Sequence, residues 1–344
     1  MKDKRETFLM EPLKKCIDLI GFPMDLGADR RGVDMGPTAI RIAGMVEELE
    51  MLGYHVHDLG DIPILSKERQ NIINPKLKYL DEIVRASCLL AEKVKLSLLQ
   101  GRFPLCIGGD HSMAIGSIAG VSAYCRHTHH TFGVIWIDAH ADMNTEDTTP
   151  SGNIHGMAMA VSLGLGNSSL TRILDFAPKV QPSCCALIGV RKIDPLEKEL
   201  VKTLRLPVHT MSNIDRKGVH ATIQDVLQTL SHVDHIHVSF DLDSVDPSVA
   251  AGVGTPVAGG LTYREIHLIM ETIADCGCMA SLDIAEINPI LDNRNISAKL
   301  AAEVVASSMG RRILKTANDG SLMFFCDPLS VICFVLDPEP SANI

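Results

Sequence analysis

The chain has 344 residues, of which 46% are hydrophobic and 22% are charged. Such a composition supplies aliphatic side chains for a large core and is unlike that of a disordered chain. The 42 acidic residues outnumber the 32 basic residues and give a formal net charge of -10. Because a negative protein repels a phosphate backbone, nucleic acid is not an expected partner.

The ends of the chain and its cysteines indicate the compartment. Residues 1–20 carry charges where a secretory signal peptide needs an unbroken apolar stretch. The most apolar late stretch, 329–336, is far shorter than the roughly 20 residues of a membrane-spanning helix. Ten cysteines are too sparse for a disulfide scaffold, and none forms a CxxC pair typical of structural zinc. We therefore expect a cytoplasmic protein with free thiols and no membrane segment.

Short aliphatic runs alternate with longer segments of helical period, a pattern typical of a parallel sheet with crossover helices. The predicted strands lie near residues 16–21, 54–58, 103–107, 133–138, 184–190, 207–211, 235–241 and 279–284. The predicted helices cover residues 37–52, 77–99, 113–124, 195–204, 219–230, 263–275 and 297–314. For the helix at 263–275, Thr262 and Glu265 predict a capping box, and Gly277 lies where a helix end needs a positive φ.

This pattern predicts one α/β domain, 1–314, with an eight-stranded parallel sheet and helices on both faces. No internal repeat or linker marks a second domain. The helical period fails in the tail, 315–344, where apolar clusters mix with Pro and Asp. Because exposed apolar clusters are costly, we expect the tail to pack either on a neighbouring subunit or on its own domain.

Polar clusters follow four of the predicted strands. The carboxyl ends of parallel strands share one edge of a sheet, so these clusters can converge on one site. In an extended chain, residues two apart point to the same side and lie roughly 6.6 Å apart, so the side chains of one cluster can face one point. The clusters are GGDH (108–111), DAHAD (138–142), DLD (241–243) and Glu286.

The DAHAD and DLD clusters bring together the carboxylates of Asp138, Asp142, Asp241 and Asp243. Each close pair would cost on the order of 4 kcal/mol at about 4 Å with an effective dielectric near 20. Two divalent ions would offset all four charges, whereas one would offset only half of them. An oxygen-rich donor set with two imidazoles favours Mn²⁺, with Fe²⁺, Co²⁺ and Ni²⁺ as alternatives. A lone DxD is often a turn or a helix cap. Together, however, the GGDH, DAHAD and DLD clusters predict a binuclear metal site.

Longer motifs resemble the ureohydrolases, and specifically the arginases. They are GGDHS (108–112), DAHADMNT (138–145), SGNIHG (151–156) and SFDLDSVDP (239–247). The SGN element is typical of arginase-like rather than agmatinase-like members, and the resemblance extends over about residues 17–314. It implies a three-layer α/β/α fold, two Mn²⁺ ions per subunit, hydrolysis of L-arginine to L-ornithine and urea, and a homo-oligomer that is a trimer or a hexamer. An agmatinase, or another ureohydrolase of a guanidino substrate, is the alternative; a scaffold protein without catalysis is a less favoured one.

The resemblance also implies roles for the metal cluster. One ion would bind His111, Asp138, Asp142 and Asp241, and the other would bind Asp138, His140, Asp241 and Asp243, so that Asp138 and Asp241 bridge. A metal-bridging hydroxide would attack the guanidinium carbon, because metals lower the pKa of bound water. Asp142 would pass a proton to the departing amine, Glu286 would align the guanidinium group and His155 would shuttle protons. The only tryptophan, Trp136, is assigned to the core rather than to a ligand.

The resemblance also assigns residues to the α-carboxylate and the α-amino group of the substrate. Asn and Ser side chains can donate hydrogen bonds to a carboxylate, and an Asp side chain can accept them from an ammonium. Without the resemblance, most would be interpreted as loop and cap residues. Glu197 either assists its neighbour Asp194 or faces solvent. The α-carboxylate is assigned to Asn144, Ser151 and Asn153, the α-amino group to Asp194, and further substrate contacts to Glu197 and Thr255.

Lys192 departs from the arginase pattern, because many arginases have an acidic residue at this position. Pointing into the site, its ammonium would oppose the ammonium of the substrate and raise KM. Pointing outward, it would matter little.

Overall fold

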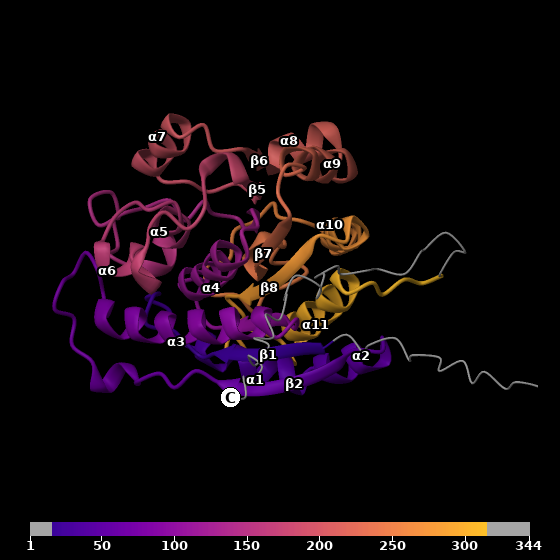
Figure 1. The fold of residues 1–344 in the computed structure, drawn as a ribbon, viewed down its shortest axis with the longest axis horizontal. Coiled ribbons are helices and arrows are strands. Elements are labelled where there is room, and N and C mark those ends of the chain that lie inside the picture. Colours follow the sequence, from indigo (N-terminus) through magenta and orange to yellow (C-terminus); the bar gives the residue numbers. More distant parts are fainter. Residues whose placement is uncertain (1–15, 315–344) are drawn as a thin grey trace, which may run out of the picture.

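Eight parallel strands form one sheet in the computed structural model, which describes residues 16–314 (Figure 1). The strands are β1 (Cys16–Phe22), β2 (His55–Asp61), β3 (Phe103–Gly108), β4 (Phe132–Ile137), β5 (Cys185–Val190), β6 (Val208–Thr210), β7 (His235–Asp241) and β8 (Met279–Ala285). All eight predicted strands are therefore confirmed. Their order across the sheet is β2-β1-β3-β8-β7-β4-β5-β6. The central four, β3, β8, β7 and β4, are the strands that the polar clusters follow.

Both faces of the sheet are buried along its inner strands, as the continuous apolar runs predict, whereas the edge strand β2 is largely exposed. Along β4, Val134 and Trp136 belong to one cluster of buried side chains, whereas Ile135 and Ile137 belong to a second cluster. This alternation follows from the two-residue period of a strand. The sheet therefore lies between two apolar cores.

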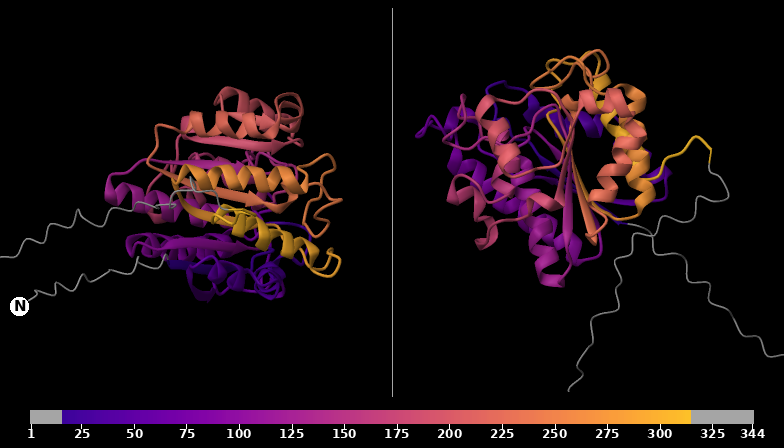
Figure 2. Two further views of the ribbon diagram at one scale, coloured as in Figure 1. Left: turned by 90° about the vertical axis from the view of Figure 1, so that its right-hand side faces the viewer. Right: turned by 90° about the horizontal axis from the view of Figure 1, so that it is seen from above.

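Helices cover both faces and complete the three layers (Figure 2). One core takes side chains from α3 (Leu80–Leu99), α4 (Met113–Thr128), α5 (Ala158–Ser162), α6 (Ser168–Thr171) and α7 (Pro195–Thr203). The other takes side chains from α1 (Gly36–Ile42), α2 (Met45–Met51), α8 (Met211–Lys217), α9 (Val219–Thr229), α10 (Tyr263–Cys276) and α11 (Ile296–Ser308). The predicted α/β class with helices on both faces is confirmed.

Two predicted helices extend through a glycine that has a positive φ in the structure. The predicted helix at 37–52 is two helices, because Gly44 adopts a φ of 87° between α1 and α2. The helix at 297–314 ends at Ser308, shortly before Gly310 with a φ of 93°. Glycine adopts this left-handed conformation readily, so both breaks have a local cause in the sequence. The capping box of α10 and the positive φ of Gly277 are as predicted.

The prediction of free thiols is wrong at one pair of cysteines. Cys276 and Cys278 form a disulfide at the end of α10. The left-handed Gly277 between them turns the chain so that their Cα atoms lie 5.5 Å apart, which a disulfide can span. The tail 315–344, with its predicted packing contact, lies outside the described residues.

Candidate metal centre and substrate cavity

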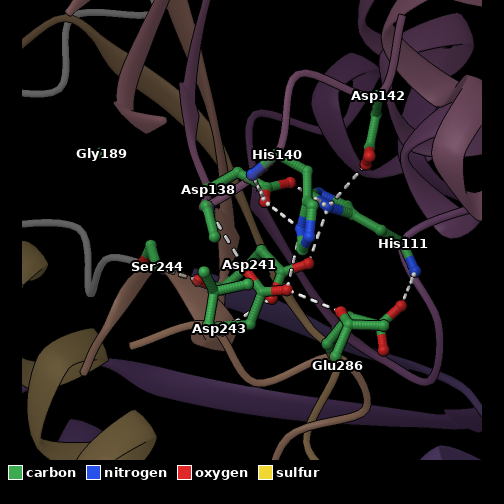
Figure 3. A network of polar contacts seen from close by, with 12 residues as sticks. His111, Asp138, His140, Asp142, Gly189, Asp241, Asp243, Ser244 and Glu286 are labelled. Atoms are coloured by element: carbon green, nitrogen blue, oxygen red, sulfur yellow. Dashed lines mark hydrogen bonds and ion pairs between the residues drawn. The ribbon is translucent and has the colours of Figure 1, made fainter. Parts of the chain in front are cut away.

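The predicted metal ligands lie together at the carboxyl ends of three central strands (Figure 3). His111 follows β3, and Asp138 follows β4 directly. Asp241 is the last residue of β7, and Asp243 lies in the 3-10 turn Leu242–Ser244 that continues it. Since β7 lies between β8 and β4, the order of the sheet brings together segments that are about a hundred residues apart in the chain.

The two imidazoles are the centres of the cluster. His111 Nδ1 lies 3.0 Å from Asp138 Oδ2, 3.1 Å from Asp241 Oδ2 and 3.4 Å from Asp142 Oδ2. His140 Nδ1 lies 3.1 Å from Asp243 Oδ2 and 3.4 Å from Asp138 Oδ1. All six predicted ligands therefore lie in one network of contacts.

Within this network, two groups have ligand atoms close enough to surround an ion. One is His111, Asp138 and Asp142, and the other is Asp138, His140 and Asp243. Asp138 belongs to both groups, as a bridging carboxylate would. Asp241 belongs to neither, although it contacts His111. The structure thus contains a His/Asp cluster that can bind metal, with Asp138 shared between two potential sites.

Three of the four carboxylates in the cluster resist ionisation, whereas for Asp138 the effect of burial is outweighed by His111 and His140, which lower its pKa. Burial and the charge of Asp138 raise the pKa of Asp142 to about 6. Burial and neighbouring carboxylates also raise the pKa values of Asp241 and Asp243. Carboxylates that resist ionisation for these reasons are stabilised in their ionised form by bound cations. The donor set, four carboxylates with two imidazoles, therefore fits divalent metal ions.

Two side chains outside the predicted site hold the ligands in place. The Trp136 indole stacks on His111, with ring centroids 4.0 Å apart, and its Nε1 donates to Asp138 Oδ2 at 3.0 Å. Ser239 Oγ lies 2.9 Å from His111 Nε2. Trp136 is fully buried, so its assignment to the core is confirmed, but it also orients a metal ligand. Such contacts fix the direction in which a ligand presents its donor atom.

The backbone is strained at two predicted catalytic residues. Asp142 has a φ of 48° and Glu286 a φ of 65°, a region that residues with a Cβ rarely occupy. Such conformations persist where surrounding contacts enforce them, and they gather at functional sites. The carbonyl of Asp142 accepts hydrogen bonds from Met159 and Ala160. The start of α5 thereby holds Asp142 in this conformation.

The buried Glu286 and the partly buried His155 form a pair beside the cluster. His155 Nδ1 lies 2.9 Å from Glu286 Oε1, and the same oxygen accepts the backbone N–H of His111 at 3.0 Å. Burial acts to lower the pKa of His155, but the hydrogen bond and charge of Glu286, with Asp142 and Asp110, raise it to about 9. His155 therefore carries a proton at neutral pH in this arrangement. Glu286 Oε2 is buried without a hydrogen-bond partner among the described residues.

A cavity of about 210 Å³ opens onto the cluster. Its wall contains the ligand candidates His140, Asp142 and Asp241, together with His155 and Thr255. Thr255 Oγ1 donates to Asp243 Oδ2 at 2.7 Å, so it is anchored to the cluster. The remaining wall comes from loops: Asn144, Thr149, Pro150, Ser151, Asn153, Gly156, Lys192, Asp194 and Glu197. Every predicted substrate contact thus lines this cavity.

Glu197 stabilises the loops on one side of the cavity. It is buried in the first turn of α7, and its carboxylate accepts the backbone N–H groups of Met143 at 2.8 Å and Asp194 at 2.9 Å. Burial raises its pKa to about 7. The solvent-facing alternative for Glu197 is therefore wrong.

Lys192 is exposed, yet it lies in the wall of the cavity close to Asp194. Its place in the wall is compatible with the predicted orientation toward the site. Among residues 16–314, it is the only lysine in the wall of this cavity.

Several residues that build the site were not predicted to do so. For Trp136 and Ser239 a signal was present in the sequence, because each lies in a strand two residues before a predicted ligand and therefore points to the same side. Thr149, Pro150 and Gly156 lie in or beside the SGNIHG motif.

Comparisons with known proteins agree with this geometry. The profile of the arginase family matches residues 15–310. The arginase of Bacillus subtilis is 47% identical over 302 residues, which are 88% of this chain and 100% of that protein. The crystal structure of Bacillus caldovelox arginase matches with a TM-score of 0.84 at 47% identity, covering 87% of this chain and 100% of that chain. Entamoeba histolytica arginase in complex with L-ornithine is 29% identical, with a TM-score of 0.80 over 87% of this chain and 99% of that chain.

None of the helices between residues 16 and 314 combines the length and the apolar character that crossing a membrane requires.

Proposed function

The chain belongs to the arginase family of hydrolases, and on that premise we propose that it converts L-arginine to L-ornithine and urea at a centre of two Mn²⁺ ions. The relatives at 46–47% identity are arginases from Bacillus and Brevibacillus species, which supports arginine as the substrate. The observation that carries the proposal is one cavity that joins a buried His/Asp cluster to neutral donors and a carboxylate.

The residues that would hold the metals are those of the cluster. One ion would bind His111, Asp138, Asp142 and Asp241, and the other Asp138, His140, Asp241 and Asp243. When bound, the two ions would lower the pKa of water and so supply a nucleophile for the poorly electrophilic guanidinium carbon. The hard oxygen donors support Mn²⁺ over zinc.

Asp142 of the cluster and its neighbours Glu286 and His155 would orient the guanidinium group and transfer protons. The unpartnered Glu286 Oε2 would accept a guanidinium N–H, and this contact would orient the substrate. Asp142 would receive the proton that the nucleophile loses and deliver it to the departing nitrogen. Protonated His155, which is partly exposed to the cavity, would exchange protons between this site and solvent.

The loop residues would select the α-amino acid. Asn144, Ser151 and Asn153 can donate hydrogen bonds to an α-carboxylate, whereas Asp194 can accept from an α-ammonium. Thr255 and Glu197 would support this arrangement through their bonds to Asp243 and to the Asp194 backbone. Agmatine lacks the α-carboxylate, so these residues favour arginine over the alternative substrate.

The proposal includes a homo-oligomer, either a trimer or a hexamer, and a cytoplasmic location. It also includes a division into a catalytic domain, 1–314, and a tail, 315–344. Light scattering on the purified chain, with and without the tail, tests the subunit count.

Urea release from metal-loaded protein tests the activity. L-Arginine and agmatine are compared at matched concentrations after loading with Mn²⁺, with a chelated sample as the control. Manganese-dependent urea release from arginine, at a much higher rate than from agmatine, is the expected result. Preference for agmatine would retain the metal centre but refute the assignments of Asn144, Ser151 and Asp194.

A further inference from the structure

Lys78 lies behind the cavity wall, just before α3. Its Nζ donates to Asn153 Oδ1 at 2.9 Å and to Asp29 Oδ1 at 2.6 Å. The Lys78 side chain is only 19% exposed, whereas the Asp29 carboxylate is largely in solvent. Lys78 is thus largely shielded from solvent and bonded to Asn153 in the cavity wall, so it can determine the orientation of that side chain.

The segment around Lys78 also supports the whole loop from 149 to 153. The Lys78 backbone N–H donates to the Gly152 carbonyl at 3.1 Å, and Lys76 Nζ donates to the Thr149 carbonyl at 2.8 Å. Gly152 has a φ of 77°, and a Cβ there would overlap the Pro75 carbonyl oxygen. The two segments are therefore in direct backbone contact.

The contact with Lys78 determines which way the Asn153 amide faces. Oδ1 accepts from the ammonium, so a flipped amide would place its NH₂ group against a cation. The pKa of Asp29 is lowered by its hydrogen bond from Lys78 and, to a lesser extent, by Asn153. An amide nitrogen has two N–H bonds, so a contact with Asp29 still leaves one for a ligand. Asn153 lines the cavity, and its backbone N–H donates to Ser151 Oγ at 3.2 Å.

We propose that Lys78 is a positioning residue that fixes the polarity of the Asn153 amide, so that this wall presents N–H donors to the α-carboxylate of the substrate. The inference rests on the proposed function, because it names the group of arginine that the wall recognises. Lys78 acts through Asn153 and does not itself touch the substrate.

The test compares ligands that differ only in the α-carboxylate. Kinetics are measured with L-arginine and agmatine as substrates, and inhibition with L-ornithine and putrescine, on Mn²⁺-loaded Lys78→Met. We expect KM for arginine and the inhibition constant of ornithine to rise about tenfold, because a hydrogen bond to a charged group is lost. The kcat for arginine should stay within about twofold, and the constants for agmatine and putrescine should not change.

Two further variants separate positioning from a structural role. Lys78→Arg keeps a cationic donor and should restore most of the affinity for arginine and ornithine. Lys202→Met removes a lysine of an exposed ion pair on α7 and should leave all constants unchanged. Melting temperatures show whether each variant is folded.

A double-mutant cycle shows whether Lys78 acts through Asn153. If it does, Lys78→Met combined with Asn153→Ala should bind ornithine no more weakly than Asn153→Ala alone. Additive losses, or equal losses for ornithine and putrescine, would overturn the inference. Failure of the wild-type protein to hydrolyse arginine would instead refute the proposed function. Ornithine and putrescine binding would then be measured directly by calorimetry on the Mn²⁺-loaded proteins, which still reports on Lys78.

Discussion

Asn144 Nδ2 donates a hydrogen bond to Asp194 Oδ2 at 3.0 Å and so joins the loop after β4 to the start of α7. On its other side, Asn144 Oδ1 accepts from Thr148 Oγ1 at 3.0 Å. The amide orientation is therefore fixed, and the residue proposed for the α-carboxylate is bonded to the residue proposed for the α-ammonium. The α-carboxylate and the α-ammonium of a substrate would therefore bind two residues that are hydrogen-bonded to each other.

Asn144→Ala should therefore weaken recognition of the α-carboxylate. The expected result is a fall of about tenfold or more in kcat/KM for arginine with little change for agmatine, because a charge-assisted hydrogen bond is lost. Asp194→Ala should lower kcat/KM for both substrates, because agmatine keeps the amine that Asp194 would bind. Metal content should remain that of the wild type in both variants. An unchanged ratio of arginine to agmatine activity in Asn144→Ala would refute its assignment to the α-carboxylate.

Lys192 should disfavour substrates of high positive charge. Agmatine carries two positive charges and arginine a net charge of one, so an ammonium in the cavity wall repels agmatine more. With about 1 kcal/mol for a pair of charges at 4 Å in water, Lys192→Ser should raise agmatine activity relative to arginine activity by up to about fivefold. The effect should shrink in high salt. Lys198→Ser, on the exposed part of α7, is the matched control and should leave the ratio unchanged.

Asp241→Ala tests the proposed second bridge. If Asp241 contacts both ions, the variant should lose both, with metal affinity reduced by more than about 100-fold. Asp243→Ala is the matched comparison, since Asp243 belongs to only one of the two groups and should cost mainly one ion. Elemental analysis after gel filtration measures the content. Two tightly held ions in Asp241→Ala would rule out its bridging role.

Metal removal should destabilise the protein increasingly as the pH rises. In the metal-free protein the pKa of Asp142 is raised from its ordinary 3.8 to about 6, so the folded state holds more protons than the unfolded state between these values. Its stability therefore falls as the pH rises through that window. Bound metal keeps the carboxylates ionised, so the gain in Tm on adding Mn²⁺ should grow by several degrees between about pH 5 and pH 7. A gain in Tm that is independent of pH would contradict the electrostatic account, and Asp142→Asn should show a weaker dependence.

The local sequence was sufficient for most of the secondary structure. Buried strands were recognisable by their apolar runs, and the start of α10 by Thr262 and Glu265, because these signals depend on neighbouring residues. The single helix predicted at 37–52 failed at Gly44, since apolar periodicity does not report the sign of φ. The disulfide of Cys276 and Cys278 was missed for the same reason, because it depends on the left-handed turn between them.

The sequence by itself determined the chemical character of the site, because carboxylates and imidazoles at strand ends demand cations wherever those ends meet. Only the tertiary structure decided which ends meet: β7 and β8 return to the centre of the sheet between β3 and β4, and this order places Asp241 beside His111. It also brought Glu286 to His155 and Lys78 to Asn153. These pairs join residues 131 and 75 positions apart, and no local pattern encodes such contacts, since they depend on how the helices and strands pack.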